Sequence, residues 1–162
     1  MDDNTAFALL FWVGIALLIV WAIGKRLKER ARIRALDISG VDLMSGVEFE
    51  RYVAHLLKHR GYRVQFTPGS GDLGVDLIAV SNGTRTAIQC KRHGKSVSRR
   101  AISDAVAGKT YYKCSEAQVV TNSYFTKGAR TLAASTHCTL VDREKLTDWI
   151  LDFQGKQASK TN

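Results

Sequence analysis

Four polar residues in the middle of the chain are of types that could together hydrolyse a phosphodiester bond. Asp76 begins an apolar segment, Gln89 and Lys91 lie two positions apart in the next one, and Glu50 belongs to an earlier amphipathic segment. Carboxylate and amide oxygens suit Mg²⁺, a hard cation that usually retains several waters. A lysine beside the metal can hold or deprotonate the attacking water and stabilise negative charge developing at phosphorus.

The segments around these residues are expected to be strands that bring them together. Strands are predicted at about 62–67, 75–80 and 85–91, and Asn82-Gly83 between two apolar runs is a strong signal for a tight hairpin. The hairpin would place Asp76 beside the end of the strand that carries Gln89 and Lys91. Side chains alternate along a strand, so Gln89 and Lys91 should share one face, with Cys90 on the other.

The glycines before Asp76 could suggest a different function. Residues 69–74 satisfy the spacing GxGxxG of a dinucleotide-binding loop. That motif requires a helix immediately after it, whose N-terminus receives the pyrophosphate, and here a strand is expected instead. We therefore expect no nucleotide cofactor, and a glycine-rich turn that delivers Asp76 onto a buried strand.

The remaining elements predict an α/β domain. Ser45 and Glu48 form a capping box that opens a helix ending at Gly61, after a break at Ser39-Gly40. The later elements are expected to be helices at about 98–113, 126–135 and 142–153, with strands at 117–121 and 139–141. A meander of strands followed by alternating helices and strands indicates a mixed central sheet flanked by helices.

Several short segments together resemble a known family. They are Phe49-Glu50, Gly61-Tyr62, Gly69 to Ala79, Gln89-Cys90-Lys91-Arg92 and Phe125-Thr126-Lys127-Gly128-Ala129. This pattern resembles the Mrr-type (type IV) restriction endonuclease domain of the PD-(D/E)xK nuclease superfamily, over residues 41–152. The resemblance implies a restriction-endonuclease-like αβββαβ core and Mg²⁺-dependent cleavage of DNA, in restriction of foreign or modified DNA.

The resemblance also implies roles for individual residues. By motif position, Asp76 matches the metal-binding acid, Gln89 the variant second position, Lys91 the catalytic lysine and Glu50 the helical acid, so that Asp76, Gln89 and Glu50 would hold the metal. Asp72 matches the family's Gly-Asp pair. Most of the superfamily has Asp or Glu where this chain has Gln89, although the QxK form is usual in the Mrr-type branch. A neutral amide predicts weaker metal binding unless Glu50 compensates.

A basic run follows the proposed catalytic lysine. Arg92, Lys95, Arg99 and Arg100 are candidate contacts to DNA phosphates, which position the nucleic acid without reading its sequence. The formal net charge of +9 suits a polyanionic partner. Three cysteines without CxxC or Cys/His spacing predict reduced structural thiols rather than a zinc site.

The N-terminal part of the chain predicts a membrane anchor. Residues 6–24 carry no charge and are followed by a basic cluster, whereas two acids precede them. Length and the positive-inside rule therefore predict a single-pass protein of the inner membrane, with its N-terminus outside and the nuclease domain in the cytoplasm. The expected division is an anchor over 1–24, a basic juxtamembrane linker over 25–39, the endonuclease domain over 40–154 and a polar tail over 155–162.

Alternatives remain open from the sequence. A catalytically weak or inactive module of the same fold could tether DNA or a partner protein at the membrane. RNA could be the substrate, because nothing in the sequence distinguishes the two sugars. Cleavage of both DNA strands with one active site per chain would favour a homodimer.

Overall fold

The computed structural model describes residues 12–25, 37–69 and 73–158, which fall into two compact units. The first unit covers Met1–Ala35, and its described part is one helix over residues 12–25. The second unit covers Leu36–Asn162 and contains the sheet and the helices around it.

Within the described part of the chain, no helix combines the length and apolar character needed to cross a membrane. This finding contradicts the transmembrane helix predicted ahead of the core, and the predicted inner-membrane localisation is therefore wrong. Residues 6–11 of the predicted span lie outside the described residues.

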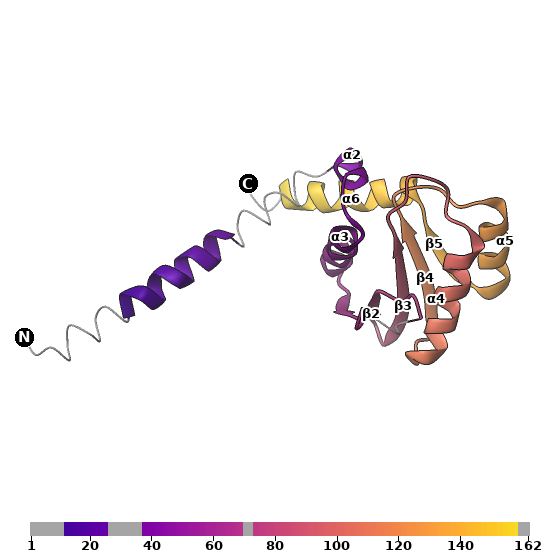
Figure 1. Cartoon of the computed structure of the whole chain (residues 1–162), viewed down its shortest axis with the longest axis horizontal. Coiled ribbons are helices and arrows are strands. Elements are labelled where there is room, and N and C mark those ends of the chain that lie inside the picture. Colours follow the sequence, from indigo (N-terminus) through magenta and orange to yellow (C-terminus); the bar gives the residue numbers. More distant parts are fainter. Residues whose placement is uncertain (1–11, 26–36, 70–72, 159–162) are drawn as a thin grey trace, which may run out of the picture. The chain divides into compact units, whose positions relative to one another are not determined.

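The second unit alternates helices and strands after an initial meander. The helices are α2 (Ile38–Asp42), α3 (Gly46–His59), α4 (Arg99–Tyr111), α5 (Lys127–Thr136) and α6 (Arg143–Ala158). The strands are β1 (Arg63–Phe66), β2 (Leu77–Ser81), β3 (Thr84–Lys91), β4 (Glu116–Thr121) and β5 (Cys138–Val141). Figure 1 traces this order along the chain.

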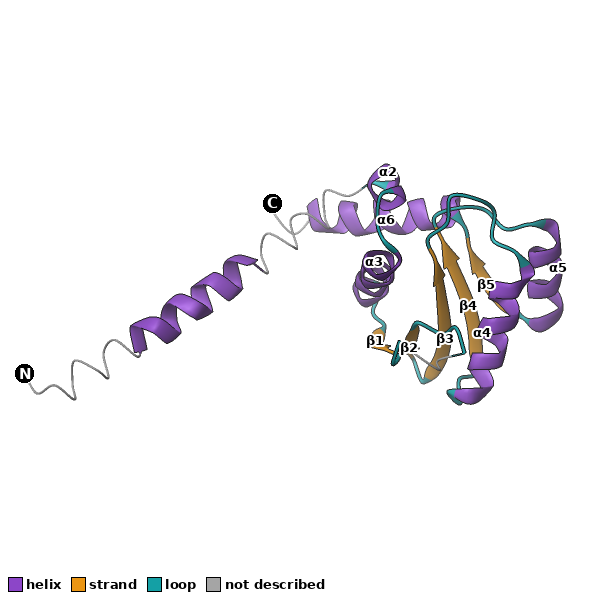
Figure 2. Ribbon diagram, in the orientation of Figure 1, coloured by secondary structure: helices purple, strands orange, loops and turns teal. Residues whose placement is uncertain are grey.

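The five strands form one mixed sheet whose spatial order is the chain order, β1-β2-β3-β4-β5. The first three strands pair antiparallel, and β4 and β5 join parallel to β3. α3 and α6 contact one face of the sheet, whereas α4 and α5 cover the other, as Figure 2 shows. The prediction of an α/β fold with a mixed sheet flanked by helices is confirmed.

Local signals set the element boundaries. At α3, the Ser45 side chain accepts from the Glu48 amide and the Glu48 side chain accepts from the Ser45 amide, the expected capping box. Such a cap is worth about 1 kcal/mol. Four buried apolar side chains of this helix, at roughly 1.5–3 kcal/mol each, outweigh it; they are Phe49, Val53, Leu56 and Leu57. The cap therefore fixes where α3 begins, and packing against the sheet holds it in place.

The turn between β2 and β3 follows from its two residues. Asn82 and Gly83 have φ of 49° and 79°, and the flanking Ser81 and Thr84 are register partners. Positive φ at both central positions is the type I′ geometry that matches the twist of a hairpin. This turn sets the register that carries Gln89 and Lys91.

One predicted boundary differs from the structure. Ser39-Gly40 was expected to break the chain, but both residues lie inside α2. The cause is Asp37, which caps this helix by accepting a hydrogen bond from the Gly40 amide. The preceding connector over residues 26–36 lies outside the described residues.

Candidate active site

Asp76 is held at the start of β2 by two contacts with β3. Its backbone amide donates to the Ile88 carbonyl at 2.9 Å, and its Oδ2 accepts from the Cys90 amide at 2.6 Å. Leu77 is also paired with Ile88, so Asp76 and Leu77 both lie opposite this one residue of β3. This pairing is typical of a β-bulge, a feature that re-aims side chains beside active sites. The Asp76 carboxylate therefore reaches the peptide between Gln89 and Lys91.

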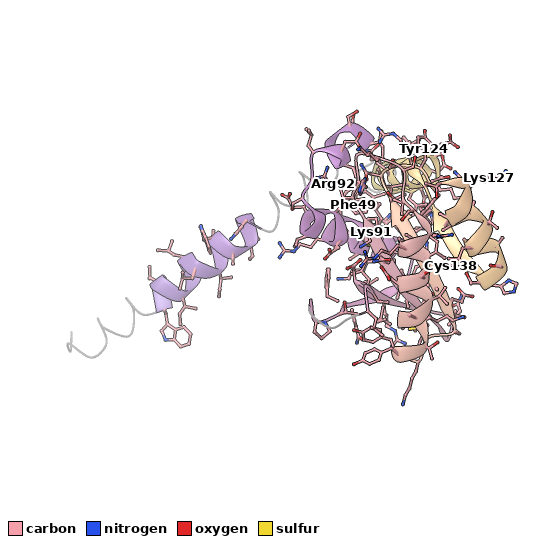
Figure 3. All side chains as sticks on the ribbon, turned by 45° about the vertical axis from the view of Figure 1, so that its right-hand side comes forward. Phe49, Lys91, Arg92, Tyr124, Lys127 and Cys138 are labelled. Carbon is pink, nitrogen blue, oxygen red and sulfur yellow. The ribbon has the colours of Figure 1, made fainter. Side chains whose placement is uncertain are left out.

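Gln89 and Lys91 project to the same face of the sheet. Their parallel register partners on β4 are Val119 and Thr121. Val119 belongs to the apolar core that α4 and α5 build on this face, together with Ile102 of α4. The Lys91 backbone is fixed further, because its carbonyl accepts a 2.6 Å hydrogen bond from the hydroxyl of the buried Thr121. Figure 3 labels Lys91 and Arg92 at the end of β3.

Gln89 is fully buried, with no exposed surface. Among the residues that the structure describes, neither its Oε1 nor its Nε2 has a hydrogen-bond partner. A buried polar group without a partner costs about 1–3 kcal/mol, so such groups are rare and call for an explanation. One explanation is a ligand that the amide oxygen is built to receive.

The Gln89 amide lies next to Gly74 and close to Asp104. A Cβ added to Gly74 would lie 2.8 Å from Gln89 Nε2 and 3.0 Å from Asp104 Cβ. The chain segment that leads into Asp76 thus passes directly over the Gln89 amide, against Asp104 of α4. Gly74 also has a φ of +77°, which L residues with a side chain rarely adopt. The last glycine of the GxGxxG spacing serves this close approach.

The charges of the predicted site converge around Cys90. Burial raises the pKa of the Cys90 thiol well above its ordinary value. The negative charges of Asp76 and Glu50 raise that pKa further, and the positive charge of Lys91 lowers it. Glu50 reaches this point from α3, which packs on the sheet face opposite α4.

A hollow of about 340 Å³ opens over the Lys91 end of β3. Lys91, Arg100 and Asp104 line it, together with residues of the segment between β3 and α4. Lys91 and Asp104 are half-buried, whereas Arg100 is exposed at the rim. The hollow offers the cationic side chains of Lys91 and Arg100 for a phosphate.

A second hollow of about 580 Å³ adjoins the first, sharing His93 and Ser96 with it. Its lining includes the predicted DNA contacts Arg92 and Lys95, both exposed, and also Arg143 and Tyr124. Asp42 is the one acidic residue in this lining among the residues that the structure describes. The surface around the proposed site is thus predominantly basic.

A polar network fixes the loop after Lys91. Arg143 donates from Nη1 and Nη2 to the two carboxylate oxygens of Asp42, each at 2.8 Å. Asn122 donates to Asp42 at 2.7 Å and accepts from the His93 amide at 2.8 Å. The Arg143 guanidinium holds the pKa of Asp42 below its ordinary value, and the Asp42 carboxylate raises the pKa of Arg143. The network anchors the basic loop to α2 and to the start of α6.

The predicted site residues are therefore only partly gathered. Asp76, Gln89 and Lys91 meet at one end of the β2–β3 hairpin, and Arg92, Lys95 and Arg100 surround the adjoining hollows. Arg99 is exposed at the start of α4 and lines neither hollow. Asp72 lies outside the described residues.

Two features of the site were not predicted from the sequence. One is the Asp42–Arg143 pair, whose members are 101 residues apart. The other is Asp104, which the sequence places on the inward-facing side of α4, one turn after Arg100 and one turn before Gly108. That spacing places Asp104 on the helix face of the buried Gly108, because residues four apart share a face, but it does not show what Asp104 contacts.

The donor set fits a magnesium ion. No group of three or more His, Cys, Asp or Glu side chains able to hold a metal occurs among the described residues. Mg²⁺ does not need one, because it usually keeps several waters and takes one or two carboxylates. Asp76 and the unpartnered amide oxygen of Gln89 are oxygen donors of the required kind.

Comparisons with known proteins show a family match and a similar fold. The family model Mrr_cat, described as "Restriction endonuclease", matches residues 41–150. None of the curated proteins compared with the sequence matches it. A crystal structure of AF1548, a protein of unknown function, is similar with a TM-score of 0.51 and 20% identity, covering 57% of this chain and 55% of that one. At this identity the likeness concerns the fold alone.

A second solved structure is less similar. The MspJI restriction endonuclease in complex with a 27-mer oligonucleotide gives a TM-score of 0.43 and 21% identity. The match covers 62% of this chain and 25% of that one. The chain thus spans about half the length of AF1548 and about a quarter of MspJI.

Proposed function

Since the chain belongs to the Mrr_cat family of restriction endonucleases, we propose that it is a Mg²⁺-dependent endonuclease that hydrolyses DNA phosphodiester bonds. The observation that carries the proposal is the hydrogen bond from the Cys90 amide to Asp76, which places the acid against the peptide between Gln89 and Lys91. The type IV restriction role, the choice of DNA and the metal are parts of this proposal.

Each residue has a role that its surroundings support. Asp76 and Gln89 would hold the cation through their oxygens, and Glu50 would add negative charge from the α3 side. The cation, when bound, would neutralise charge on the phosphate and make water a better nucleophile. Lys91 would orient the attacking water and stabilise the charge that develops on the phosphoryl oxygens.

DNA would lie over the two hollows beside Lys91. Arg92, Lys95 and Arg100 would contact its phosphates, with Arg99 at the periphery. Contacts of this kind give affinity and position without sequence preference. They favour a polyanionic substrate, and the oxygen donors at Asp76 and Gln89 favour metal-dependent cleavage over binding alone.

The proposal is tested by incubating the full chain with supercoiled plasmid in Mg²⁺ and in EDTA. Lys91→Ala should lower metal-dependent nicking by about 10²-fold or more. Lys127→Ala is the matched control, because Lys127 is exposed at the start of α5 and lines neither hollow. Binding without nicking, unchanged by metal and by Lys91→Ala, would overturn the proposal in favour of a binding module. Cleavage of RNA but not DNA would overturn the choice of substrate.

A further inference from the structure

Gln89 contributes a neutral amide to the proposed metal site. This amide is completely buried, and neither of its polar atoms has a hydrogen-bond partner within residues 12–25, 37–69 and 73–158. A neutral amide attracts a divalent cation less strongly than a carboxylate does, because ligand charge is a main determinant of affinity. An acid on the same face of the sheet could supply the charge that Gln89 lacks.

Asp104 is such an acid. A Cβ atom added to Gly74 would lie 3.0 Å from the Cβ of Asp104, 3.5 Å from its Cγ and 2.8 Å from Nε2 of Gln89. The side chains of Asp104 and Gln89 are therefore neighbours on either side of Gly74, although Gln89 makes no hydrogen bond with Asp104. Asp104 is half-buried and lines the same hollow as Lys91.

The position of Asp104 distinguishes it from Glu50. α4 packs on the face to which Gln89 and Lys91 project, whereas Glu50 comes from the helix on the opposite face. No ion pair or hydrogen bond joins the Asp104 side chain to another described residue. A half-buried carboxylate thus lies beside the buried amide of Gln89.

We propose that Asp104 is a further metal-binding residue, which provides from α4 the negative charge that Gln89 does not carry. The inference rests on the proposed function, because the cation is the one that Asp76 would share. Asp104 and Gln89 would then act as a pair. The carboxylate of Asp104 on α4 and the amide of Gln89 on β3 would together do what a single acid on β3 could do.

The pair relationship gives a sharp test by isothermal titration of the full chain with Mn²⁺, a cation that suits the same carboxylate and carbonyl oxygens. Asp104→Asn should weaken Mn²⁺ binding about 10-fold or more. Gln89→Glu introduced into Asp104→Asn should restore the affinity to within about threefold of the wild type. Asp148→Asn is the control for the loss of one charge, since Asp148 is exposed on α6 and should leave the affinity unchanged.

The outcomes separate this inference from the proposed function. Wild-type affinity in Asp104→Asn, with cleavage intact, would overturn the inference and leave the nuclease standing. If the double variant unfolds at the wild-type temperature and still lacks the Mn²⁺ affinity lost in Asp104→Asn, that result would show a structural role for Asp104 and would also overturn the inference. If the double variant does not fold, Asp104→Glu decides: it keeps the charge, and an equal loss of affinity would contradict the inference. No Mn²⁺ binding and no cleavage by the wild type would instead remove the proposed function.

Discussion

The Asp76 carboxylate accepts a 2.6 Å hydrogen bond from the backbone amide of Cys90, the residue between Gln89 and Lys91. This bond ties the acid to the strand that carries the proposed catalytic residues Gln89 and Lys91. The negative charge of Asp76 can therefore be removed by a substitution that keeps this hydrogen bond.

Asp76→Asn should abolish metal-dependent cleavage while preserving the fold. The asparagine oxygen can still accept from the Cys90 amide, but the charge that binds the cation is lost. We expect cleavage to fall about 100-fold or more, with DNA retention in gels and the unfolding temperature nearly unchanged. Asp148→Asn, on an exposed part of α6, should cleave at the wild-type rate. Full cleavage by Asp76→Asn would contradict the assignment of this residue.

Gly74→Ala and Gly83→Ala form a matched pair. Both residues have positive φ, +77° and +79°, so each alanine should destabilise the fold by about 1–2 kcal/mol. A Cβ at Gly83 meets open space, whereas one at Gly74 meets Gln89 and Asp104. Denaturant melts should therefore show a loss for both variants, and only Gly74→Ala should also lose Mn²⁺ affinity. Equal Mn²⁺ affinity in the two folded variants would mean that the Gly74 segment does not shape the site.

Lys95→Ala should weaken DNA binding uniformly across sequences. Lys95 is exposed at the larger basic hollow, where a phosphate contact releases counterions. The slope of log affinity against log salt should fall by about 0.9 in magnitude. Binding isotherms at several salt concentrations measure this slope, and Lys127→Ala should leave it unchanged. A slope equal to that of the wild type would place the DNA elsewhere.

Asp42→Asn should destabilise the protein near pH 7 by about 1 kcal/mol, because it weakens a partly exposed bidentate pair with Arg143. The hydrogen bonds from Arg143 lower the Asp42 pKa from its ordinary 3.8. The unfolded state therefore takes up the proton first, so the stabilisation is complete above about pH 4 and is lost as the pH falls through the lowered pKa. Urea melts of both proteins at a series of pH values should show the difference in stability shrinking below about pH 4. A difference that grows with acidity would contradict this sign.

The parts of the site that depend on neighbouring positions along the chain could be predicted, and those that depend on packing between elements could not. Asn82-Gly83 set the hairpin register, so the convergence of Asp76 with Gln89 and Lys91 followed from local signals. The importance of Asp104 depends on how closely α4 approaches the segment at Gly74, which no local pattern specifies. The same holds for Asp42 and Arg143. The membrane prediction rested on the uncharged stretch over residues 6–24 and on its flanking charges, whereas no helix among the described residues combines the length and apolar character needed to cross a membrane.

The order of the strands has a consequence for how fast the site assembles. β2 and β3 are joined by a two-residue turn, and such hairpins form in about 1–10 μs. β4 can join only after the chain has crossed over through α4, and parallel pairing of this kind is slow because its contacts are distant in sequence. Asp76, Gln89 and Lys91 should therefore be brought together early in folding. Asp104, carried by the crossover helix, should arrive late, so the charge of the site is complete only when the sheet is.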